Sequence, residues 1–112
     1  MATEQKFLDF IIDQMGFSDQ ITYKKMFGEY GVYFDTKLFA LVCDNQLFIK
    51  PTQSGREHIN EVIEASPYPG AKPSFLILEK LDDREWLRKL VEITVNELPE
   101  PKLKNVKTKN KK

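Results

Sequence analysis

Four short apolar runs joined by two-residue connections constrain the fold of this chain more than any other feature. The runs are Tyr23–Phe27, Tyr30–Asp35, Leu38–Asp44 and Leu47–Lys50, and the connections are Gly-Glu, Thr-Lys and Asn-Gln. Parallel strands need crossovers of about a dozen residues or more, whereas two residues are enough for a hairpin. The pattern therefore predicts a four-strand antiparallel meander.

The third run is apolar at nearly every position. Strict alternation divides its side chains between the two faces of the strand: Leu38, Ala40 and Val42 on one, Phe39, Leu41 and Cys43 on the other. A strand that is apolar on both faces is typical of a buried position in a sheet. We therefore expect it to be a central strand covered on both sides.

A helix is expected on each side of the meander. Before it, apolar residues recur at helical spacing between Phe7 and Met15, with Thr3 as the capping residue. After Pro51, a second helix is expected to continue through Ala65. Its cap is either Thr52 or Ser54, the latter with Glu57 in a capping box, and its buried stripe is Ile59, Val62 and Ile63.

The last part of the domain is read as loop, strand and helix. Three prolines make Ser66–Pro73 a loop, and Ser74–Leu78 is the last strand. Asp82 is the expected N-cap of the final helix, because Glu85 completes a capping box and Leu81 can pack on Trp86. The predicted core is a single one and contains Phe7, Ile11, Phe34, Leu41, Ile49, Ile77, Trp86 and Leu90.

These elements predict a single α+β domain: an antiparallel sheet of about five strands with three helices packed against it. The domain covers residues 1–98 and is followed by a Lys-rich flexible tail, 99–112. The tail carries six lysines and one glutamate, so 6 − 1 = +5, while residues 1–98 carry 11 basic and 16 acidic residues, so 11 − 16 = −5. A weak, nonspecific affinity for nucleic acid through the tail is one hypothesis.

The Gly-Glu-Tyr-Gly stretch at residues 28–31 is not read as a phosphate loop. It lacks the glycine spacing of such loops and is followed by a strand, whereas phosphate loops direct a helix N-terminus at the ligand. Gly28 is expected to supply a positive φ in a turn or bulge, and Gly31 a close approach on a strand.

No catalytic, metal or cofactor site is expected. Cys43, the single cysteine, lies in the most apolar run, where burial raises the pKa of a thiol and leaves it inert. His58 is the only histidine, so one Cys and one His are available for a tetrahedral zinc site that needs four ligands. We expect the chain not to be an enzyme.

Lysine and tyrosine side chains at strand ends are the candidate ligand- or partner-binding residues: Lys24, Lys25, Tyr30, Lys50, Tyr68 and Lys72. They could bind a small anion, as a binding protein or a small enzyme, or stack a base. The same residues also occur as ordinary strand-edge side chains. Both interpretations stay open at this point.

The stretch Lys24–Pro51, with Tyr-Pro-Gly-Ala-Lys-Pro and Asp-Asp-Arg-Glu-Trp-Leu later in the chain, resembles the N-terminal domain of the TfoX/Sxy family. The resemblance covers Phe7–Leu98 and implies a compact α+β fold. Family members are bacterial, and the named ones regulate natural competence. The resemblance implies a regulatory context. The residues themselves favour a cytoplasmic protein without a membrane span, because no apolar run approaches about 20 residues, and no cofactor is expected. A strand that is apolar on both faces, with three helices to cover one sheet, favours a protein partner or a second copy of the chain. Two-domain members carry a helical C-terminal domain after this one, whereas we expect this chain to be a stand-alone N-terminal domain followed by the Lys-rich segment.

Overall fold

The computed structural model describes residues 3–26 and 29–99. These residues form three helices and six strands, so the α+β class is confirmed. In chain order the elements are α1 (Gln5–Met15), β1 (Ile21–Met26), β2 (Glu29–Phe34), β3 (Lys37–Cys43), β4 (Gln46–Ile49), α2 (Gln53–Ile59), β5 (Glu64–Ala65), β6 (Ser74–Ile77) and α3 (Arg84–Glu97).

The six strands form one antiparallel sheet in the order β1-β2-β3-β4-β6-β5. The predicted meander is confirmed, because β1 to β4 are neighbours in chain order. The sheet has one strand more than the predicted five or so. The additional strand is β5, which is only two residues long and pairs with β6 at the edge of the sheet.

The prediction of a second helix through Ala65 is wrong, because α2 ends at Ile59. Asn60 follows with φ 76° and ψ −69°, and the N–H of Glu61 donates to the carbonyl of Ile59 at 3.0 Å. This is the geometry of a γ-turn, a rare and strained reversal over three residues. The turn directs the chain away from the helix axis and toward the edge of the sheet.

A β-bulge in β3 changes the predicted division of its side chains. Tyr33 pairs with Leu38 and Val32 with Ala40, so Phe39 is the extra residue. Phe39 and Ala40 are both fully buried in the core, and Leu38 lies instead beside Gly31 on the opposite face. A bulge interrupts alternation in this way by placing two residues of one strand opposite one residue of its partner.

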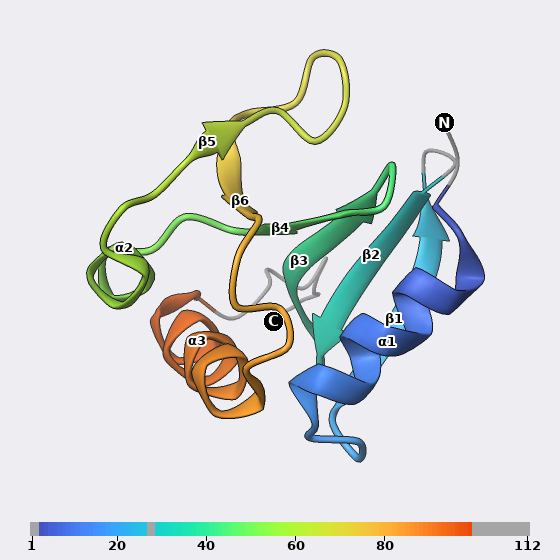
Figure 1. Ribbon diagram of the computed structural model, residues 1–112, viewed down its shortest axis with the longest axis horizontal. Helices are drawn as coiled ribbons and strands as arrows, with labels where there is room; N and C mark the ends of the chain where they lie inside the picture. Colours follow the sequence, from blue (N-terminus) through green and yellow to red (C-terminus); the bar gives the residue numbers. More distant parts are fainter. Residues whose placement is uncertain (1–2, 27–28, 100–112) are drawn as a thin grey trace, which may run out of the picture.

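The helices lie on one face of the sheet. In Figure 1, α1 is drawn in front of β1, α3 lies below β4 and β6, and α2 lies beside α3. The core between the two layers joins α1, α3 and the sheet: Leu8, Ile11, Met15, Ile21, Val32, Phe39, Ala40, Val42, Leu47, Ile49, Phe75, Ile77, Leu87, Leu90, Val91 and Val95. Three predicted core residues, Phe7, Phe34 and Trp86, are partly buried against it. The assignment of Leu41 to the core is wrong. It pairs with Phe48 on the face that the described helices do not cover.

The caps differ from the predicted ones in two helices. Thr3 does not cap α1. Its hydroxyl donates to Glu29 Oε1 at 2.6 Å and ties the N-terminus to β2. Asp83, not Asp82, caps α3 by accepting the N–H of Trp86 at 3.1 Å. Of the two candidates for α2, Thr52 is the cap, and Ser54 instead donates to Glu97 of α3 at 2.7 Å.

Among residues 3–26 and 29–99, no helix combines the length and the apolar character that crossing a membrane requires.

Candidate protein-binding groove

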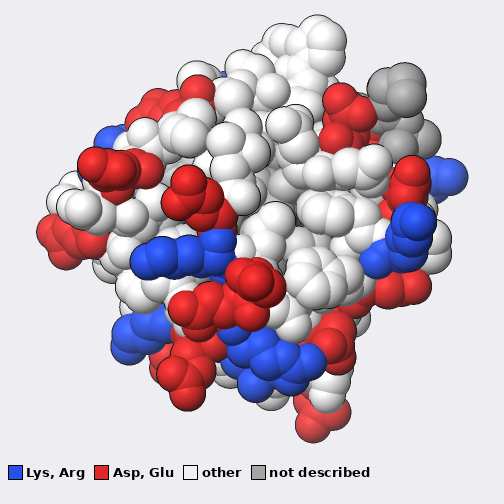
Figure 2. Space-filling view, in the orientation of Figure 1, with Lys and Arg blue, Asp and Glu red and all other residues white. Residues whose placement is uncertain are grey.

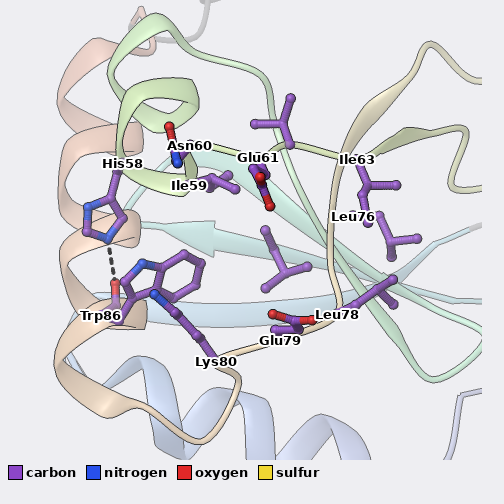
Figure 3. A pocket seen from close by; sticks show the side chains of 12 residues that line it. His58, Ile59, Asn60, Glu61, Ile63, Leu76, Leu78, Glu79, Lys80 and Trp86 are labelled. Atoms are coloured by element: carbon purple, nitrogen blue, oxygen red, sulfur yellow. Dashed lines mark hydrogen bonds between the residues drawn. The ribbon is translucent and has the colours of Figure 1, made fainter.

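A groove lies where the chain segments 59–63 and 76–80 separate from one another. The β5–β6 ladder ends at a hydrogen bond of 2.7 Å from the N–H of Leu76 to the carbonyl of Ile63. Beyond this bond the two segments diverge instead of pairing, because the γ-turn at Asn60 leads back to α2. The space between them is a cavity of about 460 Å³, and Figure 3 shows the side chains that line it.

The end of the groove far from β5 is closed by α2 and α3. The rings of His58 and Trp86 stack with centroids 5.1 Å apart and planes 24° apart. His58 Nε2 lies 3.1 Å from the carbonyl oxygen of Trp86, which can only accept, so Nε2 carries the proton. Lys80 Nζ lies 5.5 Å from the centroid of the Trp86 ring, within the range of a cation–π contact. These contacts hold the end wall in place (Figure 3).

The groove presents apolar side chains to solvent. Ile63 is 48% exposed and Leu78 is 56% exposed, the two highest values among the large apolar side chains that the structure describes. Ile59 and Val62 form part of the wall and pack against the core. The apolar surface is therefore continuous with the fixed interior of the domain and is not carried by a separate loop.

The charged lining of the groove is mainly acidic. Glu61 and Glu79 line it from the two diverging segments, and both are exposed. Neither forms an ion pair with another residue of the described chain. The one basic residue of the lining, Lys80, lies against Trp86. A ligand in the groove would therefore meet two carboxylates that have no cationic partner in the described structure.

A second hollow, of about 540 Å³, lies at the end of α1 and beside β1. Its exposed aromatic residues are Phe17 and Tyr23, and both are in ring contacts within the chain. Phe17 packs on Phe34 with centroids 5.4 Å apart, and Tyr23 on Tyr30 at 5.7 Å. Although Phe17 and Tyr23 are exposed, each ring already packs on another ring of the chain. The 59–63/76–80 groove is therefore the stronger candidate for a binding site.

The family model for the TfoX N-terminal domain matches residues 13–98, which is most of the chain and includes the whole groove. The chain belongs to the TfoX N-terminal domain family. It is also 36% identical over 109 residues to a protein of Spirochaeta aurantia described as an uncharacterized 12.7 kDa protein in the trpE 5′ region. That alignment covers 97% of this chain and 95% of the relative, so the two proteins match over nearly their full lengths.

The side chains predicted as a binding set do not come together in this TfoX N-terminal domain. Lys24 and Lys25 lie on edge strand β1, next to Tyr30 on β2. Tyr68 and Lys72 lie in the β5–β6 connection at the opposite edge of the sheet. Lys50 directly follows β4, between these two groups. Lys24 Nζ lies 5.7 Å from the Tyr33 ring centroid, a contact of a strand-edge lysine with its own sheet.

The close approach predicted at Gly31 is present. A Cβ atom there would lie 2.9 Å from Met26 Sδ and 3.1 Å from Leu38 Cδ1, so β2 has no room for a side chain at this position. Gly28 lies outside the described residues. Gly31 thus serves the packing of β2 against its neighbours and is not among the residues that line the groove.

The described residues offer little reactive chemistry. Cys43 is 3% exposed, and its pKa is raised to about 11 by burial and, to a lesser degree, by the charges of Glu29 and Asp44. A thiol with this pKa is almost entirely protonated at neutral pH and is a poor nucleophile. No group of three or more His, Cys, Asp or Glu side chains within residues 3–26 and 29–99 is arranged to hold a metal ion.

The sequence did not indicate the groove. Ile63 fitted the apolar stripe of an extended α2, and Leu78 was the last residue of an ordinary apolar strand. The usable signal was the apolar residue at the end of each segment, followed by charged residues at Glu64 and Glu79. That signal marks the end of an element but does not show that two such ends face one another.

Proposed function

We propose that this protein is a non-enzymatic interaction domain that binds a protein partner through the 59–63/76–80 groove. The observation that carries the proposal is the exposure of Ile63 and Leu78 on the two sides of one fixed cavity. Single exposed apolar residues are common on protein surfaces, whereas apolar residues grouped in a concave surface with a polar rim favour a binding site. The regulatory role of named TfoX/Sxy proteins supports a partner in transcriptional regulation.

A protein partner fits the charge of the domain better than a nucleic acid does. Residues 1–98 have a net charge of 11 − 16 = −5. Figure 2 shows acidic and basic side chains interspersed on one face, around an uncharged middle, with no continuous basic surface on that face. A phosphate backbone is bound chiefly by grouped lysines and arginines. The hypothesis of nucleic-acid binding through the Lys-rich segment concerns residues 100–112, which lie outside the described part of the chain.

The proposal is tested by affinity capture from the native cell with three forms of the full chain. The wild type and Phe10→Glu should retain the same partner, and Leu78→Glu should lose it. Phe10 is a matched control, because it is 41% exposed on α1 and lies outside the groove. Light scattering at micromolar concentration shows whether the partner is a second copy. A partner retained equally by Leu78→Glu, with the fold intact by circular dichroism, contradicts the proposal.

A further inference from the structure

We infer that the groove binds an extended peptide segment of alternating apolar and basic residues, which pairs with the open backbone edge at Leu78, directly after β6. This inference rests on the proposed function and specifies its partner. It differs from binding between two folded surfaces, because backbone hydrogen bonds would contribute much of the affinity and alternate side chains the specificity. Three features of the described structure lead to it: an unpaired strand edge, two apolar contact points and an acidic lining.

The unpaired edge belongs to β6 and the residue after it. β5 pairs only with Ser74 and Phe75, and the last bond across this edge is the one donated by the N–H of Leu76. Backbone groups of an antiparallel strand alternate between its two sides. Leu78 therefore directs its N–H and C=O to the same side as Leu76, while Ile77 pairs with Leu47 of β4. No backbone hydrogen bond of Leu78 occurs within the described chain.

The position of β5 shows that this edge can carry a strand. Glu64 and Ala65 continue the sheet beside the first half of β6, and the γ-turn at Asn60 takes the preceding residues out of register. The part of the edge beyond the Leu76–Ile63 bond, at Leu78, is therefore left beside the cavity. An unpaired strand edge is a ready template for another extended chain unless charges, proline or a covering element protect it. Here the edge borders apolar side chains.

The side chains of the groove define the chemistry of the added segment. In a strand, alternate residues point to the same side. One set of its side chains can contact Ile63 and Leu78, which needs apolar residues. Glu61 and Glu79 line the same groove without a cationic partner among the described residues, so lysine or arginine at the intervening positions complements them. A cavity of about 460 Å³ holds only a few side chains, which fits a short segment.

A display library of random ten-residue peptides, selected on the immobilised full chain, tests the inference. We expect enrichment of peptides in which apolar residues alternate with lysine or arginine. The enriched peptide should lose about tenfold in affinity to Leu78→Ser and to Ile63→Ser, and should bind Phe10→Ser as it binds the wild type. Melting temperatures of the variants, measured in parallel, show that each is folded.

Backbone pairing is tested by N-methylation of the enriched peptide, one amide at a time. The free backbone groups of this edge are those of Leu78, so affinity should fall about tenfold at the amide that donates to the Leu78 carbonyl and change little at its two neighbours. Uniform tolerance of N-methylation overturns strand addition, as does enrichment of acidic peptides or the absence of any enriched peptide. The proposed function is tested separately. If no peptide adds as a strand but the groove still binds a folded partner, the wild-type chain captures that partner and Leu78→Glu does not.

Discussion

Asn60 is the residue on which the shape of the groove depends most. Its backbone lies at φ 76° and ψ −69°, and the next residue closes the γ-turn with a hydrogen bond of 3.0 Å. A non-glycine residue in such a conformation costs about 1 to 3 kcal/mol and persists only where its surroundings hold it. Here α2 on one side and the Leu76–Ile63 bond on the other fix both ends of the turn.

Replacement of Asn60 by glycine or alanine should therefore give different stabilities. Glycine adopts a positive φ without the steric cost of a Cβ atom, while it loses more entropy on folding. Because the steric cost to alanine exceeds the extra entropy that glycine loses, Asn60→Gly should be more stable than Asn60→Ala by about 1 kcal/mol. Urea unfolding of the two variants measures the difference. Equal stabilities, or a more stable alanine variant, would show that the turn is not strained.

Glu97 links the end of α3 to the start of α2. Its carboxylate accepts hydrogen bonds from the backbone N–H of Gln53 at 2.7 Å, from the N–H of Ser54 at 2.9 Å and from the Ser54 hydroxyl at 2.7 Å. These bonds, chiefly that of the Ser54 backbone, lower the pKa of Glu97 below its usual value of 4.5. They stabilise the ionised form of the carboxyl in the folded state.

The acid dependence of stability should change in Glu97→Gln. Because the pKa is lower in the folded chain, the contribution of Glu97 is present above about pH 4.5 and is lost as the pH falls through the folded pKa. Glu97→Gln should be less stable than the wild type at pH 7, and the gap should narrow at pH 3. Thermal melts of both proteins at the two pH values measure this difference in stability. A difference in stability that is the same at both pH values would contradict this explanation.

At the scale of elements, the start of α3 shows how a sequence pattern can be displaced by one residue. Both Asp82 and Asp83 can cap a helix, and the capping-box pattern favoured Asp82. In the structure Asp83 is the cap, and its carboxylate accepts the N–H of Trp86. Asp83→Ala should therefore cost about 0.5 to 2 kcal/mol.

The neighbouring aspartate provides the control for that prediction. Asp82→Ala removes the same charge one residue earlier, where no hydrogen bond to the helix start is found within the described residues. Its effect on the free energy of unfolding should be clearly smaller than that of Asp83→Ala. Chemical denaturation of both variants compares them. A larger cost for Asp82→Ala would show that Asp82 is the N-cap, as the capping-box pattern predicts.

The elements that could be predicted are those whose geometry is fixed locally. Two-residue connections leave the meander no alternative to antiparallel neighbours, and it is found as predicted. The bulge at Phe39 could not be predicted, because a continuous apolar run contains no alternation for a bulge to interrupt. The end of α2 was hidden for a related reason. Ile59 and Val62 do pack on the core, but Ile59 does so from the last residue of α2 and Val62 from the segment after the turn, instead of both from one helix.

At the scale of the whole molecule, the groove is a consequence of topology. β6 is inserted between β4 and β5, so the segments that precede β5 and follow β6 meet at the same edge of the sheet. Residues 59–63 and 76–80 are distant in the sequence and have no local pattern that pairs them. The Lys and Tyr residues at strand ends were a local pattern, and the sheet order separates them. Family membership was predictable, because the motifs that carry it lie in the folded part.

We propose that the partner binds between residues 59–63 and 76–80. The most direct test is amide chemical-shift mapping of the ¹⁵N-labelled full chain with the captured partner. We expect the largest changes on these two segments, with the Leu78 amide newly protected from hydrogen exchange. Largest changes at Lys24, Lys25 and Tyr30, or across residues 66–73, with the Leu78 amide unchanged, would contradict it.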